Sequence, residues 1–316
     1  MKRLISILLI YSSFPAVGQD VHFSQFSKSS FFLNPSLTSF QQNDYKATLQ
    51  RRSQWESVAE PFNTFSISAE RKELFPSHSI GIQFINDIAG DAKFKTTGFN
   101  FSYSKLFEIT KINLLSIAVG VGAFQRSLSF DELIFSQTEI HENINFWFPE
   151  VNLGLSNQYR LNKKISVVNG VSLFHLNKPK QSLTGDNNVR LNHKVNFHSS
   201  LYHSTNQALL FSPKIFYSIQ DKEKEFIFAF DTEYLLSGVK NVILKSGLSY
   251  RWKDAIIYNF GAAIDSFDWL ISYDINTSSL SEATNNKGGF EFSLVYVWEI
   301  KQKEKIVHPK QCPKYL

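Results

Sequence analysis

The 316-residue chain has only one cysteine, one methionine, 14 glycines and nine prolines. A single cysteine excludes an internal disulfide framework and any metal site built from several cysteines. Glycine and proline are too scarce for a fibrous repeat, and a hydrophobic fraction of 43% is too high for a disordered chain. The net charge of +5 is modest and no lysine–arginine cluster of nucleic-acid type is present, so a solvated surface of mixed sign is expected.

Long apolar runs are also missing beyond the first residues. Lys2 and Arg3 precede an apolar stretch over residues 4–14, and small residues lead up to Gly18, which predicts a cleaved secretory signal peptide over residues 1–18. After it, no run reaches the roughly 18–20 apolar residues that a membrane helix needs. The exported chain is therefore either a soluble secreted protein or a protein that enters a membrane as strands.

Aromatic residues are abundant, with 30 Phe, 12 Tyr and 5 Trp. Many recur at every second position, as Phe99, Phe101 and Tyr103 do, and this spacing is typical of strands. The pattern predicts fourteen strands whose outward aromatic side chains face lipid. Their centres are expected near Ala47, Ile67, Ile82, Phe101, Val119, Leu153, Val171, Phe197, Ile215, Phe228, Lys245, Tyr258, Ser272 and Leu294.

The connections between these strands alternate in length. Long odd-numbered connections include residues 52–61, 86–93, 125–147, 176–193 and 277–288, and short even-numbered ones include 160–164, 204–206, 235–239 and 265–266. Outer-membrane barrels have an even strand number and keep their periplasmic turns short. We therefore predict an all-β fold, a transmembrane antiparallel β-barrel of about 14 strands over residues 44–300, located in the outer membrane. A secreted β-sandwich is the alternative.

Two segments do not fit the wall of such a barrel. Residues 19–43 read as irregular but are too aromatic for a loose tail, so Phe23, Phe26, Phe31 and Phe32 are expected to pack against protein. The lumen of the barrel is one place for this segment. Residues 301–316 are charged and are expected to form a periplasmic tail.

Sequence motifs of catalysis are missing from the chain: it has no G-x-S-x-G, H-E-x-x-H, P-loop or dinucleotide fingerprint. His193, His198 and His203 recur at five-residue steps, but on a strand His198 lies on the opposite face from the other two, which argues against a shared metal. We therefore predict a non-enzymatic protein with no catalytic residue, cofactor or metal. A barrel lipase is a weaker alternative.

Three local patterns have both a structural and a partner-binding interpretation. Asn34-Pro35 predicts a stop and turn, because Pro pushes the preceding residue out of the helical region. Arg52, with Arg51, Gln54 and Trp55, predicts a cationic and aromatic rim, either an interface girdle or a contact for a partner. Cys312 has no partner in the chain and is either an inert thiol or half of a mixed disulfide with another periplasmic protein.

Short motifs occur in order along nearly the whole mature chain. They are Gln19-Asp20-Val21-His22-Phe23-Ser24-Gln25, Leu33-Asn34-Pro35, Arg52-Ser53-Gln54-Trp55, Phe174-His175-Leu176 with Pro179 and Gln181-Ser182-Leu183, Ser272-Tyr273-Asp274-Ile275-Asn276 with Ser279-Leu280, Gly288-Gly289-Phe290-Glu291 and Cys312-Pro313-Lys314-Tyr315. As an ordered set they resemble the PorP/SprF family of Bacteroidota outer-membrane proteins. Ser36, Ser53 and Lys314 depart from the family pattern, and Lys314 cannot make the bidentate contacts of an arginine.

The resemblance implies a component of the type IX secretion system, which also supports gliding motility. It implies partners too: a secreted adhesin with a type-B C-terminal sorting domain, other type IX secretion components, and a periplasmic peptidoglycan-binding protein. The candidate partner-binding residues from the motifs are His22, Phe23, Gln25, Asn34, Pro35, Arg52, Gln54, Trp55, Cys312, Pro313, Lys314 and Tyr315. The rival function is an outer-membrane porin or hydrophobic-substrate transporter resembling the fatty-acid transporter barrels, because fold alone does not fix function.

Overall fold

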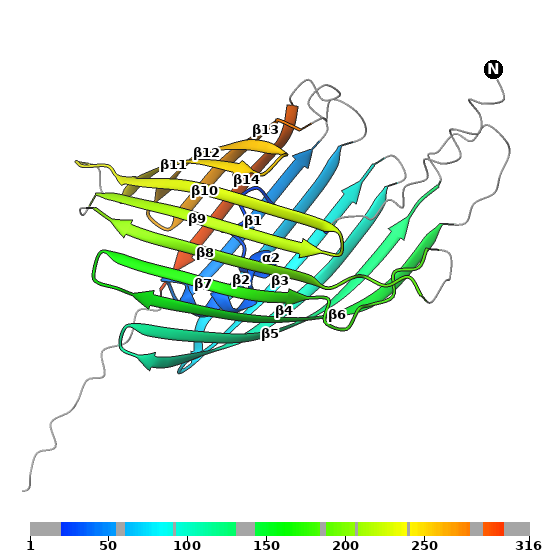
Figure 1. The fold of residues 1–316 in the computed structure, drawn as a ribbon, viewed down its shortest axis with the longest axis horizontal. Coiled ribbons are helices and arrows are strands. Elements are labelled where there is room, and N and C mark those ends of the chain that lie inside the picture. The colour runs from blue at the N-terminus through cyan, green and yellow to red at the C-terminus, as the bar shows by residue number, and fades with distance from the viewer. Residues whose placement is uncertain are drawn as a thin grey trace, which may run out of the picture.

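A computed structural model describes residues 20–54, 61–90, 93–130, 143–183, 188–205, 208–238, 241–278 and 287–299. These form a closed antiparallel barrel in which each strand pairs with its neighbours in the chain and β14 pairs with β1 (Figure 1). The strands are β1 (Tyr45–Gln54), β2 (Phe62–Phe75), β3 (His78–Ala89), β4 (Phe94–Thr110), β5 (Asn113–Leu128), β6 (Ile144–Arg160), β7 (Ile165–Phe174), β8 (Lys194–Ser204), β9 (Leu209–Gln220), β10 (Glu223–Leu235), β11 (Val242–Arg251), β12 (Ala255–Ile264), β13 (Phe267–Asn276) and β14 (Lys287–Trp298).

The predicted fold class and the fourteen predicted strand centres are confirmed, because each centre lies inside the strand of the same number. The barrel closes along ten residue pairs between β1 and β14, from Tyr45 opposite Trp298 to Gln54 opposite Gly289. Closure leaves no open sheet edge in the wall, which lipid could not satisfy with hydrogen bonds. Within the described part of the chain, no helix is long and apolar enough to cross a membrane.

The two faces of the wall differ as the alternation predicts. On β4, Phe99, Phe101 and Tyr103 point outward with 55%, 44% and 38% of their surface exposed, whereas Ser102 and Ser104 between and beyond them are buried inside. Small polar inward residues leave room in the lumen, and outward aromatic rings suit a lipid environment. Phe124, Phe148 and Phe216 are not among these outward rings; they are buried on the lumen side.

The odd-numbered connections lie at one end of the barrel, here called the long-loop end, and the even-numbered ones at the short-turn end. The alternation of lengths is less strict than expected. The β9–β10 connection at the long-loop end has two residues, 221–222, and the β10–β11 connection at the short-turn end spans residues 236–241. β5 and β6 also run four residues further toward the long-loop end than predicted, because the backbone pairing of the two strands continues from Gln125–Trp147 to Leu128–Ile144.

Residues 20–43, here called the plug, pass through the lumen from the long-loop end to the start of β1. Figure 1 shows α2 (Ser30–Leu33) enclosed by the strands. A 3₁₀ helix, η1 (Pro35–Phe40), follows at once, so the segment expected to be irregular contains two short helical turns. Asn34 separates them: its backbone is extended and its side-chain oxygen accepts from Ser36 N at 3.0 Å, while Pro35 occupies the first turn of η1, where a missing N–H costs nothing. The predicted stop and turn is confirmed.

Two predicted segments lie outside the described residues: the signal peptide over residues 1–18 and the periplasmic tail over residues 301–316. Both stay predictions from the sequence.

Candidate functional site

Two buried arginines and two buried carboxylates form a cluster, here called the latch, on the lumen side of β1, β11, β13 and β14. Arg52 is only 1% exposed. Its Nη2 lies 2.9 Å from Asp274 Oδ2 and its Nη1 lies 3.2 Å from Glu291 Oε2. Arg251 Nη1 lies 3.1 Å from the same Asp274 oxygen. The cluster depends on closure of the barrel, which places β1 beside β14 although the residues are more than 200 positions apart.

The plug inserts directly into the latch. Ser24 N donates to Glu291 Oε2 at 2.7 Å, and Ser24 Oγ donates to Asp274 Oδ2 at 2.7 Å and accepts from Arg251 Nη2 at 2.8 Å. The amide of Gln25 donates to Ser272 Oγ at 3.2 Å. Because buried charges are costly unless paired and hydrogen-bonded, the plug completes the coordination of charges that the wall alone leaves unsatisfied.

On the other side of the lumen, Asn34 holds the plug against β6 and β7. Its Nδ2 donates to Leu155 O and Val171 O, each at 3.0 Å. Gly154 and Gly170 make this approach possible. A Cβ added at Gly154 would collide with Asn34 Oδ1, and one at Gly170 would lie 2.7 Å from Asn34 Nδ2. The wall is therefore shaped at these two positions for the plug.

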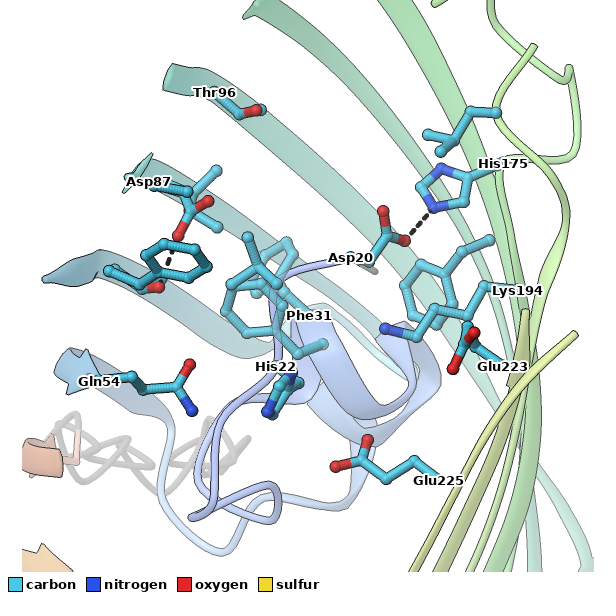
Figure 2. A pocket seen from close by; sticks show the side chains of 18 of the residues that line it. Asp20, His22, Phe31, Gln54, Asp87, Thr96, His175, Lys194, Glu223 and Glu225 are labelled. Atoms are coloured by element: carbon cyan, nitrogen blue, oxygen red, sulfur yellow. Dashed lines mark hydrogen bonds and ion pairs between the residues drawn. The ribbon is translucent and has the colours of Figure 1, made fainter. Parts of the chain in front are cut away.

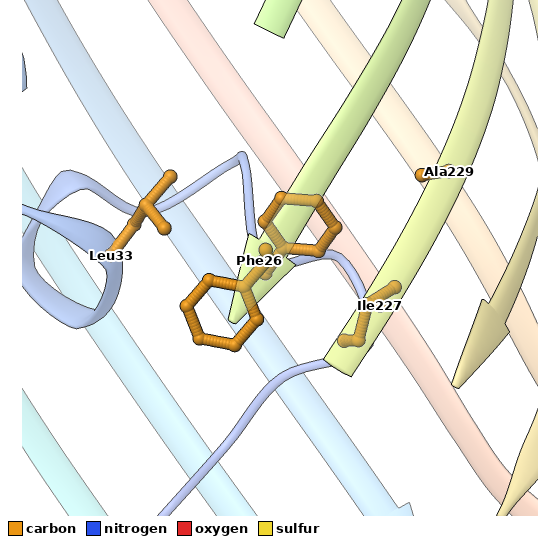
Figure 3. Packing of buried hydrophobic residues seen from close by; sticks show 5 residues of the cluster. Phe26, Leu33, Ile227 and Ala229 are labelled. Carbon is orange, nitrogen blue, oxygen red and sulfur yellow. The ribbon is translucent and has the colours of Figure 1, made fainter. Parts of the chain in front are cut away.

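An apolar contact fixes the plug against β9 and β10. Figure 3 shows Phe26 and Leu33 from the plug beside Ile227 and Ala229 from β10. The ring of Phe26 stacks on Phe216 of β9 with 5.3 Å between centroids. Ile227 has no exposed surface. This small core lies inside a barrel wall whose other face is turned to lipid.

Further contacts join the plug to β1, β2 and β4. Glu70 Oε2 accepts from Ser30 Oγ at 2.6 Å and from Thr38 Oγ1 at 2.9 Å, and Lys46 Nζ lies 3.2 Å from Glu70 Oε1. Ser39 Oγ is 2.8 Å from Ser104 Oγ on β4. The plug is thus bonded to strands on all sides of the lumen.

Above the plug, toward the long-loop end, lies a cavity of about 720 Å³. Figure 2 shows Asp20, His22 and Phe31 of the plug forming its floor, with Gln54, Asp87, His175, Lys194 and Glu225 on the surrounding wall. Its remaining lining includes the aromatic residues Phe32, Phe62, Phe94, Phe124, Phe148, Phe174 and Trp252. A concave site of this size with a few polar groups among apolar ones is typical of a binding site.

The first residue of the plug is held by a histidine just beyond β7. The Asp20 carboxylate contacts His175 Nε2 (Figure 2). On the other side of the ring, Glu150 Oε2 lies 3.5 Å from His175 Nδ1. Burial alone would lower the pKa of His175, but the charges of Asp20 and Glu150 outweigh it and raise that pKa to about 10. Burial alone would raise the pKa of Asp20, but His175 and other cations hold it well below its usual value. The pair is therefore a charged one at neutral pH.

His22, on the floor of the cavity, is in the opposite electrostatic situation. Burial lowers its pKa, and the positive charges of Arg52, Arg251 and Lys194 lower it further. His22 is therefore a neutral hydrogen-bonding group at physiological pH. Among the described residues, no three or more His, Cys, Asp or Glu side chains are grouped so that they could hold a metal ion.

The structure brings seven of the twelve candidate residues together in or beside the plug: His22, Phe23, Gln25, Asn34, Pro35, Arg52 and Gln54. Phe23 is 3% exposed, and Phe26 and Phe31 are buried with it, as expected for this segment. The expected interface girdle is wrong for Arg52, whose side chain points into the lumen. The even-numbered residues of this part of β1 face inward. Trp55, Cys312, Pro313, Lys314 and Tyr315 lie outside the described residues.

Arg126, Lys194 and Arg251 are among the charged residues of the site that were not identified from the sequence. A signal was present for Arg126 and Arg251. Arg126 and Arg251 fall on the inward phase of their strands, in step with Gly122 and Ser249, where small or polar residues are the rule. A long cation in that phase must be buried in the lumen and requires a partner.

Comparison with protein families identifies the chain. The family model described as "Type IX secretion system membrane protein PorP/SprF" matches residues 16–296. No curated protein sequence matches the chain. Solved structures share the fold alone, and three of them illustrate this at 8–9% sequence identity. They include a FadL homologue from Pseudomonas aeruginosa (9% identity, TM-score 0.53, covering 85% of this chain and 94% of that one), the Pseudomonas putida toluene transporter TodX (9%, 0.51, 84% and 91%) and the Ralstonia pickettii toluene transporter TbuX (8%, 0.51, 86% and 94%).

The chain belongs to the PorP/SprF family of type IX secretion system membrane proteins. It is an outer-membrane β-barrel of that system. In this setting the long-loop end faces the exterior of the cell and the short-turn end faces the periplasm, because outer-membrane barrels keep short turns on the periplasmic side.

Proposed function

We propose that this barrel is a non-enzymatic component of the type IX secretion and gliding motility system that binds a secreted adhesin through the adhesin's type-B C-terminal sorting domain. Binding would support the export of the adhesin or its anchoring on the cell surface. Family membership supports the secretion role, and the resemblance of the sequence motifs supports the type of cargo.

The observation that carries the proposal is the arrangement of the lumen in two levels. The plug occupies the lower level and is bonded to strands on all sides, whereas the cavity of about 720 Å³ above it lies among the outward-facing connections. A site of this size lies within the roughly 300–1,000 Å³ typical of pockets that hold ligands or inserted side chains. A closed floor beneath an outward-facing cavity suits the binding of a partner from outside.

The candidate motif residues divide into two groups under this proposal. His22 and Gln54 line the cavity and would contact the partner. Phe23, Gln25, Asn34, Pro35 and Arg52 lie below it and would act by holding the plug in place. Substitutions in the second group should therefore act on partner binding indirectly. They should reduce it only when they displace the plug residues that form the floor of the cavity.

The other partners are proposed on the sequence alone. The charged tail over residues 301–316, which ends with Cys312-Pro313-Lys314-Tyr315, would contact the periplasmic part of the secretion machinery, including a peptidoglycan-binding protein. Deleting residues 301–316 should leave the barrel folded, because the last strand ends at Trp298. Loss of periplasmic partners from a pull-down of that variant, with the adhesin still recovered, is the expected result.

A pull-down of the affinity-tagged protein from outer membranes tests the main proposal. The expected result is recovery of a large secreted protein carrying a type-B sorting domain, and loss of its surface display when the gene is deleted. Recovery of no such protein, together with normal display in the deletion strain, would contradict the proposal.

Transport of a hydrophobic substrate is the second candidate, and the aromatic lining of the cavity favours it. The similar solved folds include proteins described as toluene transporters, which supports this candidate at the level of fold only. Planar-bilayer conductance and uptake of a labelled aromatic hydrocarbon distinguish the two functions. A steady open pore, or uptake that depends on this protein, would favour transport over partner binding.

A further inference from the structure

One cation of the cavity is held in an unusual way. The guanidinium of Arg126, near the end of β5, lies over the rings of Phe94 and Phe148, with its Cζ 5.1 Å and 5.3 Å from their centroids. Its Nε donates to Thr96 Oγ1 at 3.2 Å, and its Nη1 donates to the side-chain oxygen of Gln181. The group is therefore fixed in position by two rings and two neutral acceptors.

Arg126 differs in this respect from the arginines of the latch. Arg52 and Arg251 each lie within 3.2 Å of two or more carboxylates. Among the described residues, no carboxylate lies within salt-bridge distance of Arg126. Charges taken out of water are usually paired with an opposite charge. The guanidinium of Arg126 is half-buried, faces the cavity and bonds only neutral acceptors. It can therefore bind an anion that enters the cavity.

Lys194, at the start of β8, supplies a second cationic donor, an ammonium group, to the same cavity (Figure 2). It too has no carboxylate within salt-bridge distance among the residues that the structure describes. The nearby carboxylates already have partners: Asp20 and Glu150 lie against His175, and Asp87 accepts from Thr64 Oγ1 at 2.6 Å. Among the described residues at this wall, Arg126 and Lys194 are therefore the charged groups that lack a partner of opposite charge.

We infer that Arg126 and Lys194 form a carboxylate-binding subsite for the exported partner, and that the partly exposed ring of Phe94 receives an apolar or aromatic side chain next to that carboxylate. A fixed guanidinium recognises a carboxylate by two parallel hydrogen bonds. The group bound is the C-terminal carboxylate or an acidic side chain of the partner polypeptide. The inference rests on the proposed function and adds the chemistry of the recognised segment.

A free fatty acid has the same two features, a carboxylate and an apolar part, but fits this cavity less well. The lining also contains Asp20, Glu150, Glu223 and Glu225. A long acyl chain would remove water from these groups without replacing its hydrogen bonds, which is costly. A polypeptide segment has polar backbone groups along its whole length and therefore suits a lining that mixes polar and apolar residues.

The test uses the full-length protein in detergent and two model ligands, N-acetyl-L-phenylalanine and its amide, with binding followed by ligand-observed NMR. We expect the acid to bind roughly 10- to 100-fold more tightly than the amide, the range for hydrogen bonds to a charged group. Arg126→Gln should remove this preference and Lys194→Gln should reduce it. Arg160→Gln, an exposed arginine at the short-turn end, is the matched control and should keep it.

In the binding assay with the two phenylalanine ligands, the inference is overturned by no binding of the acid, by equal binding of acid and amide, or by an unchanged preference in Arg126→Gln. A dodecanoate arm separates the two sources of the carboxylate, since dodecanoate binding roughly tenfold tighter than the acetylated amino acid would assign the site to a fatty acid. The pull-down keeps the two proposals distinguishable. If Arg126→Gln recovers the adhesin as well as wild type, the subsite is wrong and the proposed function stands; if wild type recovers none, the function fails.

Discussion

The two levels of the lumen follow different rules although the same strands enclose both. In the lower level, the charges of Arg52, Asp274 and Glu291 are matched within 3.2 Å and the plug supplies the remaining hydrogen bonds. In the upper level, Arg126 and Lys194 lie on the wall of an open cavity without a carboxylate partner among the described residues. The lower level is therefore packed like a protein core, whereas the upper level contains the cations that we propose as a binding site.

Within one barrel, the residues of the lower level stabilise the fold and those of the upper level are proposed to bind the partner. Substitutions in the lower level should release the plug, because its side chains are paired with buried wall residues. Substitutions in the upper level should change binding with little effect on the fold. Substitutions in the two levels should therefore differ in their effects on stability and on plug protection.

The largest effect is expected from Arg52→Met. It leaves the buried carboxylate of Glu291 without its guanidinium, which costs about 3–5 kcal/mol for a broken buried pair. The plug should detach and become sensitive to protease, and the folded barrel should convert to the unfolded form at a lower temperature on gels. Arg51→Met is the matched control, because Arg51 is the neighbouring residue on the exposed face of β1. Equal protease resistance in both variants would show that the latch does not hold the plug.

The contact between Asp20 and His175 marks the boundary between the two levels, and its removal is the next largest effect. Asp20→Asn should cost about 1.5–3 kcal/mol of plug anchoring, as for hydrogen bonds to charged groups. It should also move the pKa of His175 from about 10 toward its usual value of 6.5, because the carboxylate that raises it is gone. Titration of the His175 ring by NMR measures this shift. A pKa near 6.5 in wild type would contradict the contact.

The pH dependence of plug anchoring follows from the directions of the two shifts. The folded-state pKa of His175 is raised, so its contribution is complete below 6.5 and is lost as the pH rises through about 10. The folded-state pKa of Asp20 is lowered, so its contribution is complete above 3.8 and is lost as the pH falls. Anchoring of the plug should therefore be strongest between these two usual values and weaken at strongly alkaline pH, and His175→Gln should remove the alkaline loss.

A smaller effect is expected where the wall was shaped for the plug. Gly154→Ala would place a Cβ against Asn34 and 3.0 Å from Pro35 Cγ, and crowding of this kind costs about 1–3 kcal/mol. Gly120→Ala on the paired strand β5 is the control, because the three atoms nearest its Cβ would lie 3.3 Å or more away and belong to Asn152 and Phe101 of the wall, not to the plug. Protease protection of the plug should fall in the first variant alone. Loss in both would point to a general effect on the wall.

The wall could be predicted from the sequence because its cause is local. Lipid outside and a polar lumen inside impose a two-residue period on every strand, and fourteen such patterns were sufficient to place every strand centre. Strand ends could not be placed as well. β5 and β6 continue beyond the predicted ends at Gln125 and Trp147, because pairing between strands, and not contact with lipid, decides where these ends fall.

The site could be predicted only in part. The motifs contain Ser24, Gln25, Arg52, Asp274 and Glu291, all of which meet at the latch. Their meeting depends on the register with which β14 closes on β1, a long-range fact that no local pattern contains.

Phe124, Phe148 and Phe216 lie on the lumen side, where the alternation within their strands places them but where the expectation that aromatic residues face lipid does not. Each packs against a group within the lumen: Phe216 against Phe26 of the plug, Phe148 against the guanidinium of Arg126, and Phe124 against Phe148.

The smallest effect on stability is expected from Arg126→Gln, and this contrast with Arg52 is the sharpest test of the two-level comparison. Arg126 loses two ring contacts, worth about 0.5–1 kcal/mol each at partly exposed sites, and two hydrogen bonds to neutral acceptors that water in the cavity can replace. No carboxylate is left unpaired among the described residues, so the penalty that dominates at Arg52 does not arise. The variant should unfold within a few degrees of wild type and keep its plug protected from protease. Unfolding as early as in Arg52→Met would show that Arg126 belongs to the core of the barrel.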